Sequence, residues 1–166
     1  SARGINAVEV YVLKYEPSVG SLAETAVVNT FVTRHLNKIV KTTGLSVGLE
    51  NNQISIRSGT WSISVAAPVY RAGANFIRLY NVTTGKVEAQ GQSSFSNTTG
   101  GGGQSDQGVA LLEHTWKIDT TNVYEIQHYV NSVSGSSFTF GNPVALSTGA
   151  NIVNESYTEV TLNRIR

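Results

Sequence analysis

The most informative part of the sequence is Ser58-Gly59-Thr60-Trp61-Ser62-Ile63-Ser64-Val65-Ala66-Ala67-Pro68-Val69-Tyr70. Within it the apolar side chains Trp61, Ile63 and Val65 alternate with serines, which is the period-two pattern of a β-strand with one buried face. A Ser-Gly turn signal precedes the run, and Pro68 limits its ladder hydrogen bonds. We therefore predict a central strand here, with Trp61 in or beside the core.

A second strand-like run follows at Phe76-Ile77-Arg78-Leu79-Tyr80-Asn81-Val82 and ends in Thr83-Thr84-Gly85. Threonine and glycine at this point are typical of a hairpin turn, and apolar residues resume at Val87. We predict that this run and the Trp61 run are paired central strands of one domain.

Other segments show the same alternation or are rich in β-branched residues, with turn residues between them. They lie at residues 5–15, 26–34, 45–49, 53–57, 109–118, 123–130 and 157–165. A helix over residues 22–38 is the competing interpretation, but the density of Thr and Val favours extended chain. Many short strands with regular turns predict an all-β sandwich, jelly roll or barrel.

Composition narrows the function classes. The chain has 166 residues, is 40% hydrophobic but only 14% charged, and has a net charge of +1. One domain spanning residues 1–166 fits this length.

The sequence also argues against several kinds of partner. With no cluster of Lys and Arg, we expect no nucleic-acid partner. No apolar run approaches bilayer length, so we expect no membrane insertion. The absence of Cys rules out disulfides, and the absence of Met suggests the C-terminal domain of a longer chain.

Two segments predict long surface loops. Four successive glycines, Gly100–Gly103, lack the Lys-Ser/Thr of a phosphate-binding loop and indicate a flexible excursion. Residues 131–155 are rich in Ser, Gly and Asn and carry Phe138 and Phe140. Both segments break the regular spacing of the strands.

An ordered set of segments resembles a jelly-roll module of bacteriophage and other viral particle proteins. The segments are Thr33-Arg34-His35-Leu36-Asn37, Gln53-Ile54-Ser55-Ile56, Ser58-Gly59-Thr60-Trp61, Ala67-Pro68-Val69-Tyr70-Arg71, Arg78-Leu79-Tyr80-Asn81-Val82-Thr83 and Tyr124-Glu125-Ile126-Gln127-His128. That module is similar in fold to the globular heads of complement and tumour-necrosis-factor proteins. The resemblance implies a two-sheet jelly roll of roughly ten strands that assembles as a trimer at the tip of a viral fibre or spike.

Nothing in the sequence favours catalysis, a metal or a cofactor. The histidines His35, His114 and His128 lack metal-ligand spacing with one another. His114 and His128 lie in predicted strands, where a buried, hydrogen-bonded histidine is the more common case. Glu113 points to the opposite face of its strand from His114, so the two cannot form an acid–base pair. We expect no enzyme activity, no cofactor and no metal.

Aromatic side chains near predicted strand ends are the candidate receptor-binding residues. Aromatic rings stack on the C–H-rich faces of sugars, and neighbouring amide and hydroxyl groups bind the sugar hydroxyls. The candidates are Tyr70, Arg71, Tyr80, Tyr129, Phe138 and Phe140. The alternative for each aromatic residue is that it caps the core or fills a subunit interface.

Apolar residues on two faces of a strand predict a trimer interface. Residues 109–118 carry Val109 and Leu111 on one face and Ala110, Leu112, Trp116 and Ile118 on the other. Residues 5–15, which include Val10 and Val12, are likewise apolar on both faces. A symmetry-related subunit could cover such a second face. The resemblance places the closing strand, with Tyr157 and Val160, in the same interfacial sheet.

These observations lead to one main hypothesis and two alternatives. The main one is a homotrimeric head domain at the distal end of a viral fibre or spike, on the virion surface, that binds a host-cell receptor, most simply a glycan. The first alternative is a structural knob that trimerises or caps a fibre. The second is a glycan-cleaving enzyme assembled between subunits.

Overall fold

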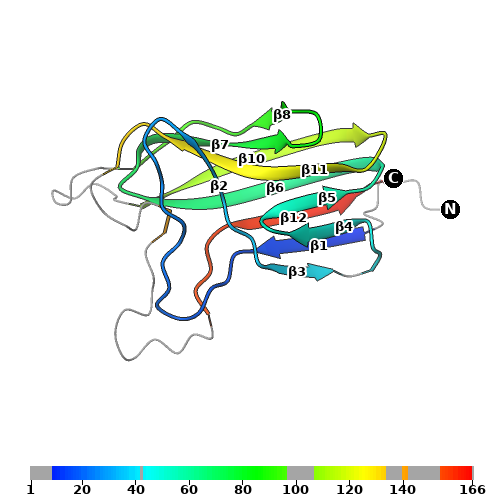
Figure 1. Cartoon of the computed structure of the whole chain (residues 1–166), viewed down its shortest axis with the longest axis horizontal. Helices are drawn as coiled ribbons and strands as arrows, with labels where there is room; N and C mark the ends of the chain where they lie inside the picture. Colours follow the sequence, from blue (N-terminus) through cyan, green and yellow to red (C-terminus); the bar gives the residue numbers. More distant parts are fainter. Residues whose placement is uncertain (1–8, 42, 97–106, 134–139, 142–153, 166) are drawn as a thin grey trace.

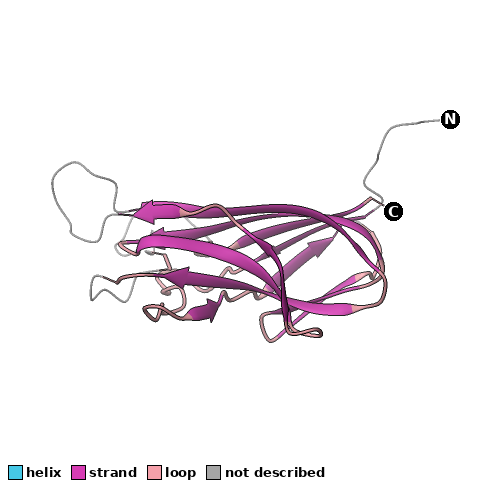
Figure 2. Ribbon diagram, turned by 90° about the horizontal axis from the view of Figure 1, so that it is seen from above, coloured by secondary structure: helices cyan, strands magenta, loops and turns pink. Residues whose placement is uncertain are grey.

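The computed structural model describes residues 9–41, 43–96, 107–133, 140–141 and 154–165. These residues form two antiparallel sheets that pack face to face as a jelly-roll sandwich, and none of them lies in a helix (Figures 1 and 2). The described part has twelve strands, rather than the roughly ten expected.

The first sheet has five strands in the order β10-β6-β12-β1-β3. Their bounds are β10 Gln107–Ile118, β6 Gly59–Tyr70, β12 Glu159–Arg164, β1 Glu9–Lys14 and β3 Lys38–Lys41. The three segments expected to share an interfacial sheet, at residues 5–15, 109–118 and 157–165, do share this one.

The second sheet has seven strands, with a main path of β4-β5-β11-β7-β8; β2 also pairs with β11, and β9 with β7. Their bounds are β4 Val47–Glu50, β5 Gln53–Ile56, β11 Asn122–Val130, β7 Gly73–Asn81, β8 Lys86–Gln90, β2 Phe31–Thr33 and β9 Ser94–Ser96. We call the side of each sheet that points away from the other sheet its outer face.

The expected pairing of the Trp61 run with the Phe76 run is wrong. These runs are β6 and β7, and they lie in opposite sheets. Strand β6 instead pairs along its whole length with β10 and along part of it with β12. The link Arg71-Ala72 is therefore a crossing between sheets, and Arg71 has a positive φ of 53° there.

Pro68 is accommodated inside β6 because its nitrogen points to a side without a partner strand. The pairing with β12 ends at Ala66, and the Pro68 carbonyl accepts a hydrogen bond from Arg34 Nη1 (2.9 Å). In an antiparallel strand the N and C=O of one residue point to the same side. The missing N–H of Pro68 therefore costs no ladder bond.

Two hairpins were predictable from their turn residues. Asn51 and Asn52 join β4 to β5 with positive φ angles of 49° and 64°, which asparagine tolerates better than most residues. The Thr-Thr-Gly turn joins β7 to β8, with Gly85 at φ 68°.

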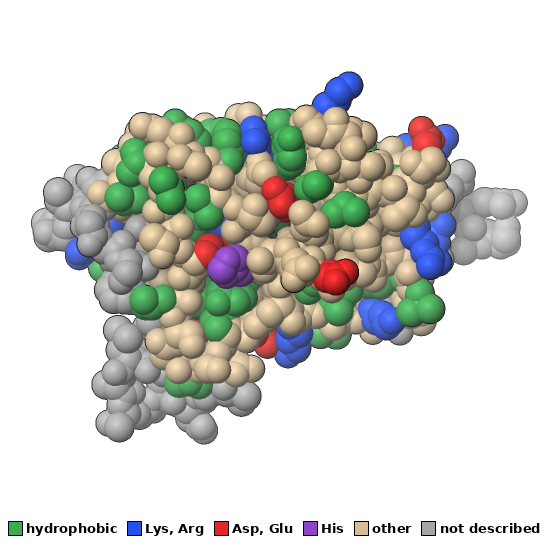
Figure 3. Space-filling model, in the orientation of Figure 1, with side chains coloured by type: hydrophobic (Ala, Val, Ile, Leu, Met, Phe, Trp, Pro, Cys, Tyr) green, Lys and Arg blue, Asp and Glu red, His purple; other side chains and the backbone are tan. Residues whose placement is uncertain are grey.

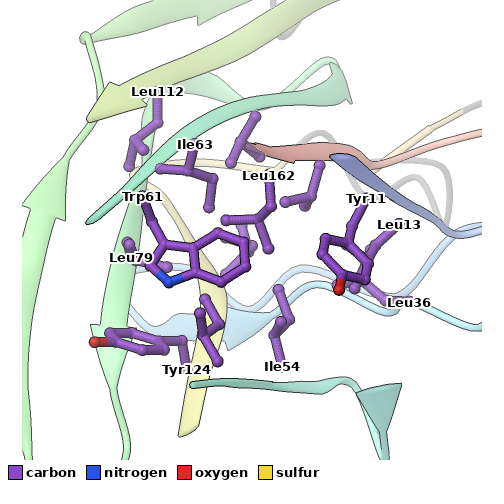
Figure 4. Packing of buried hydrophobic residues seen from close by; sticks show 14 of the residues in the cluster. Tyr11, Leu13, Leu36, Ile54, Trp61, Ile63, Leu79, Leu112, Tyr124 and Leu162 are labelled. Atoms are coloured by element: carbon purple, nitrogen blue, oxygen red, sulfur yellow. The ribbon is translucent and has the colours of Figure 1, made fainter. Parts of the chain in front are cut away.

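The main core lies between the sheets and is centred on Trp61, as expected (Figure 4). Trp61 is fully buried, Ile63 and Val65 point the same way, and the indole Nε1 donates to the Arg57 carbonyl oxygen (3.0 Å). Tyr11 and Tyr124 enter from β1 and β11, so both sheets contribute aromatic rings.

A smaller second core fills the end of the sandwich near the start of β7. It contains Ala23, Ala26, Val69, Ala72, Val130, Phe140 and Tyr157. The segment between β1 and β2, residues 15–30, contributes Ala23 and Ala26 to this core and is not helical. We call this segment the strap. The strand expected at residues 26–34 is confirmed only for Phe31–Thr33, and the helical alternative is wrong.

The fully buried Arg34 guanidinium holds this second core together. It forms an ion pair with Glu24, contacts His128 Nδ1 through Nη1 (2.9 Å) and donates through Nη2 to the Phe140 carbonyl (2.9 Å). Because arginine can only donate, His128 Nδ1 accepts, and His128 Nε2–H donates to Asn75 Oδ1 (2.9 Å). The expectation of a buried, hydrogen-bonded histidine is confirmed for His128.

Glu9, the first residue of β1, pairs with Arg164, the last residue of β12, at one end of the sandwich. The opposite end holds the last residue of β6, the start of β7 and the last residue of β11 (Figure 1). We call this the far end.

Candidate functional site

Three aromatic residues lie side by side on the outer face of the seven-stranded sheet, at the far end. Phe76 of β7 pairs with Tyr129 of β11, and Tyr129 pairs with Phe31 of β2. Their ring centroids are 5.2 to 5.6 Å apart, within the favourable range for aromatic pairs. All three are half-buried, so part of each ring faces solvent. We call these three residues the aromatic cluster.

Hydrophobic side chains gather on this face toward the end where β2 crosses the sheet (Figure 3). The cluster is held on both sides. The Arg78 guanidinium carbon lies 3.4 Å from the centroid of the Phe31 ring, a cation–π contact. The Tyr129 hydroxyl donates to Asn29 Oδ1 (2.9 Å). The rings are therefore fixed before any ligand arrives.

A chain of polar side chains runs across the same face beside the cluster. Arg78 Nε donates to Gln127 Oε1 (2.7 Å), and Gln127 Nε2 donates to Glu125 Oε1 (2.6 Å). Gln53 Nε2 reaches Glu125 Oε2 at 3.5 Å. We call Arg78, Gln127, Glu125 and Gln53 the polar ladder. It joins β7, β11 and β5.

Two of the proposed receptor-binding residues lie on this face. Tyr129 belongs to the aromatic cluster. Tyr80 lies opposite Glu125, with its ring 5.1 Å from the guanidinium carbon of Arg78. Tyr70 and Arg71 lie at the far end of β6, where the Arg71 guanidinium stacks on the Tyr70 ring (4.9 Å) and both are half-buried.

Phe140 cannot bind a receptor, and this expectation is corrected. Its ring is fully buried, stacks on His128 (4.8 Å between centroids) and lies 4.4 Å from the Arg34 guanidinium carbon. The Ser- and Gly-rich surroundings suggested a surface loop, but Phe140 anchors that segment in the second core. Phe138 and Gly100–Gly103 lie outside the described residues.

The five-stranded sheet presents a different surface, with exposed apolar residues along β10. Leu111 is 48% exposed and Val109 is 51% exposed. They lie opposite Ala66 and Pro68 of β6. We call Val109, Leu111, Ala66 and Pro68 the apolar edge.

Val10 and Val12 lie on the same outer face, on β1, and both are half-buried. Val12 lies opposite Val40 of β3, which is 51% exposed. The strands between β1 and β10 present polar side chains such as Ser64 and Thr161, which pair with each other. This face is therefore apolar on both sides and polar in the middle.

Val160 and Tyr157 cannot form an interface in this fold, and that assignment is also corrected. Val160 is fully buried in the main core. Tyr157 is 8% exposed, stacks on Tyr15 and donates its hydroxyl to the Ser21 carbonyl (2.6 Å). Val160 lies in β12 of the expected sheet and Tyr157 lies just before that strand, but the side chains of both pack in the cores of the protomer.

His114 is the one histidine whose partner comes from the opposite sheet. Its Nε2 lies 3.1 Å from Glu88 Oε1 of β8, and its ring stacks on Trp116. Glu113 is exposed on the outer face, so the predicted separation from His114 is correct. His114 is partly exposed, so it is not the fully buried histidine that was anticipated.

The described residues contain no cluster of three or more His, Cys, Asp or Glu side chains that could hold a metal. In the part of the chain that the structure describes, no helix is long and apolar enough to cross a membrane.

Sequence reasoning missed Phe31 and Phe76, although a signal for one of them was present. Phe76, Arg78 and Tyr80 are two residues apart on a strand, so they had to share a face. Phe31 was harder to find, because its pairing with β11 bridges nearly a hundred residues of sequence.

The sequence matches no protein-family model, and it matches no curated protein significantly. Solved structures share its fold. Murine APRIL has a TM-score of 0.54 with 6% identity, covering 93% of this chain and 98% of that chain. The PRD1 vertex protein P5 has a TM-score of 0.51 with 11% identity, covering 97% and 99%. The globular domain of zebrafish complement 1qA has a TM-score of 0.52 with 12% identity, covering 97% and 98%. The chain thus has the jelly-roll fold of tumour-necrosis-factor-like and complement heads, as the resemblance implied.

Proposed function

We propose that this chain is a head domain on the surface of a virion, and that it binds a host-cell receptor as a homotrimer. The fold shared with a viral vertex protein supports the setting. The aromatic cluster supports the binding role, because three partly exposed rings fixed by Arg78 and Asn29 form a rigid contact surface. Tyr and Arg are enriched in the residues that dominate binding energies.

A glycan is the receptor that this chemistry suits best. The partly exposed rings of Phe76 and Tyr129 offer apolar surface, and Phe31, with Arg78 over one face of its ring, supports them. The polar ladder beside them offers donors and acceptors. Saccharides need both, because their rings carry C–H faces and hydroxyl edges. Tyr80, at the other end of the ladder, extends the same surface. Tyr70 and Arg71 give a second contact at the far end.

The apolar edge supports the trimer. Val109 and Leu111 expose about half of their surface in the protomer, and Val10 and Val12 lie across the same face. Contact between copies would remove this apolar surface from water, at about 25 cal/mol for each Å² buried. Three receptor sites on one trimer would also raise the apparent affinity, because binding at one site raises the effective concentration of receptor at the others.

The place of the aromatic cluster on the outer face of the seven-stranded sheet fits a position at the tip of a fibre or spike. The aromatic cluster lies toward the end opposite the pairing of Glu9 with Arg164. If the chain is tethered through β1, the cluster points away from the particle toward the host. The domain then needs no nucleic-acid partner, no membrane insertion and no catalytic group.

The test is binding of the purified, labelled chain to host cells and to a glycan array. We expect Phe76→Ala to lower the apparent affinity at least tenfold, because removing a dominant contact costs about 2 kcal/mol. Phe95→Ala is the matched control, because Phe95 is 67% exposed on β9 and lies outside the cluster. Equal losses in both variants, or no binding by the wild type, would contradict the proposal.

A structural knob that trimerises or caps a fibre is the second candidate, and the apolar edge is the observation that favours it. That function needs the trimer but not the aromatic cluster. A trimer that binds no host surface, and whose assembly is unchanged by Phe76→Ala, would support the knob. A glycan-cleaving enzyme remains the third; shorter products after incubation with host polysaccharide would reveal it.

A further inference from the structure

The polar ladder keeps hydrogen-bonding capacity that the fold does not use. Arg78 donates a hydrogen bond to Gln127 through Nε. The two terminal amino groups of Arg78 make no hydrogen bond to the described residues. Each oxygen of the Glu125 carboxylate accepts one hydrogen bond, and the contact from Gln53 is long at 3.5 Å. A carboxylate can accept about four. Donors at one end and acceptors at the other therefore remain for a ligand.

The charges along the ladder do not suit an anionic ligand. Arg78 contributes one positive charge and Glu125 one negative charge, with the neutral Gln127 between them. Beyond Gln53 the next residue across the sheet is Glu50, which is exposed. A ligand on the ladder thus meets one cation and two carboxylates. A carboxylate or sulfate on the ligand would be repelled, because like charges in a partly buried site cost free energy.

We propose that the polar ladder and the aromatic cluster form one site for a neutral saccharide, with sugar hydroxyls bridging the Arg78 donors and the Glu125 acceptors. A sugar ring stacks on the aromatic cluster next to this hydroxyl-binding part. The proposal rests on the proposed function and narrows it to a class of receptor.

The length of the site predicts the length of the ligand. Tyr129 and Glu125 are four residues apart on β11, a separation of about 13 Å at about 3.3 Å per residue. This distance exceeds a single sugar ring. A monosaccharide can therefore fill the aromatic part or the ladder but not both, and a linear oligosaccharide of two or more rings should bind much more tightly.

Calorimetric titration of the full chain tests this proposal. The probes are neutral tetrasaccharides built from glucose, galactose or mannose, their monosaccharides, and tetrasaccharides containing hexuronic acid. We expect at least one neutral tetrasaccharide to bind at least tenfold more tightly than its monosaccharide and than the acidic probes. Glu125→Gln should weaken that binding about tenfold, because a hydrogen bond to a charged group is lost.

Two further variants make the result specific. Arg78→Lys keeps the charge but loses the fork of donors, and should also weaken binding. Glu159→Gln is the matched control, because Glu159 is half-exposed on the outer face of the other sheet, and it should change nothing. Thermal melting of each variant separates loss of binding from loss of fold.

The inference and the proposed function can fail separately. If the chain binds host cells through Phe76 but no neutral probe binds or competes, the inference is overturned and the proposed function stands. The same holds if the acidic probes bind as tightly as the neutral ones. If the chain binds no host surface at all, both fail.

Discussion

The buried Arg34 shows how a single charged side chain can hold four chain segments together. It contacts the strap through Glu24, β11 through His128, the loop after β11 through the Phe140 carbonyl, and β6 through the Pro68 carbonyl. Removing a charge from water is costly unless all its hydrogen bonds are made. Arg34 therefore selects one arrangement of these segments, although it adds less net stability than its contacts suggest.

His128 makes this network sensitive to pH. Burial, together with the adjacent positive charge of Arg34, lowers the pKa of His128 well below the usual 6.5. The native state therefore keeps His128 neutral, whereas the unfolded chain takes up a proton as the pH falls below about 6.5. Its contribution to stability is complete above that pH and is lost below it.

We expect the free energy of unfolding to fall by up to about 1.4 kcal/mol per pH unit below pH about 6.5. Urea unfolding at about pH 7.5 and about pH 5 measures this dependence, and the His128→Gln variant provides the comparison. The variant should lose most of the dependence in that range. An unchanged slope in His128→Gln, or a loss of the slope in the control variant His35→Gln at a half-exposed histidine, would contradict this explanation.

At the scale of elements, the close approach of the β8–β9 link to β10 shapes the edge of the sandwich. Gly91 donates its N–H to the Ile77 carbonyl (2.8 Å), and Gln92 donates to the Leu111 carbonyl (3.1 Å). A Cβ atom at Gly91 would collide with the Leu111 carbonyl oxygen. Glycine is therefore required here by space, and it sets the position of the link beside the apolar edge.

Gly91→Ala should lower the free energy of unfolding by about 1–3 kcal/mol, as expected for overpacking. Denaturant unfolding measures the effect. Ser93→Ala, at an exposed site two residues further on, is the control and should be nearly neutral. A neutral Gly91→Ala would show that the link can move away from β10 freely.

The sequence predicted those strands and turns that depend on neighbouring residues, but it did not predict pairings between segments far apart in the sequence. The alternation at Trp61 located β6, and Thr83-Thr84-Gly85 located the β7–β8 hairpin, because both signals are local. The pairing of β6 with β10 was missed because the preference of neighbouring runs to pair is only a tendency, and here the chain crosses to the other sheet at Arg71.

The candidate site was predicted in part, for related reasons. Tyr80 and Tyr129 were chosen because they are aromatic residues near predicted strand ends, and the structure places both, half-buried, on the outer face of the seven-stranded sheet. Phe140 and Val160 were misplaced because composition does not show which side of a segment faces the core. For Phe140 the decisive partner is Arg34, more than a hundred residues away in sequence.

At the scale of the molecule, the two outer faces have contrasting chemistry. The seven-stranded sheet presents fixed aromatic rings and a polar ladder, whereas the five-stranded sheet presents exposed aliphatic side chains on β10 and β3. This division is what a receptor-binding face and an assembly face would require of one sandwich.

Leu111→Asp should separate assembly from folding. Leu111 is 48% exposed in the protomer, so the protomer should stay folded while the charge disrupts contact between copies. Size-exclusion chromatography measures assembly, and far-ultraviolet circular dichroism measures the fold. Thr115→Asp, on the same strand and face but outside the apolar edge, should leave assembly intact.

The most direct test of the assembly face is sedimentation equilibrium of the wild-type chain at micromolar concentration. We expect a single species of three times the 17.8 kDa chain mass. A single species of 17.8 kDa would contradict it, because the apolar edge would then face water and the receptor sites would act alone.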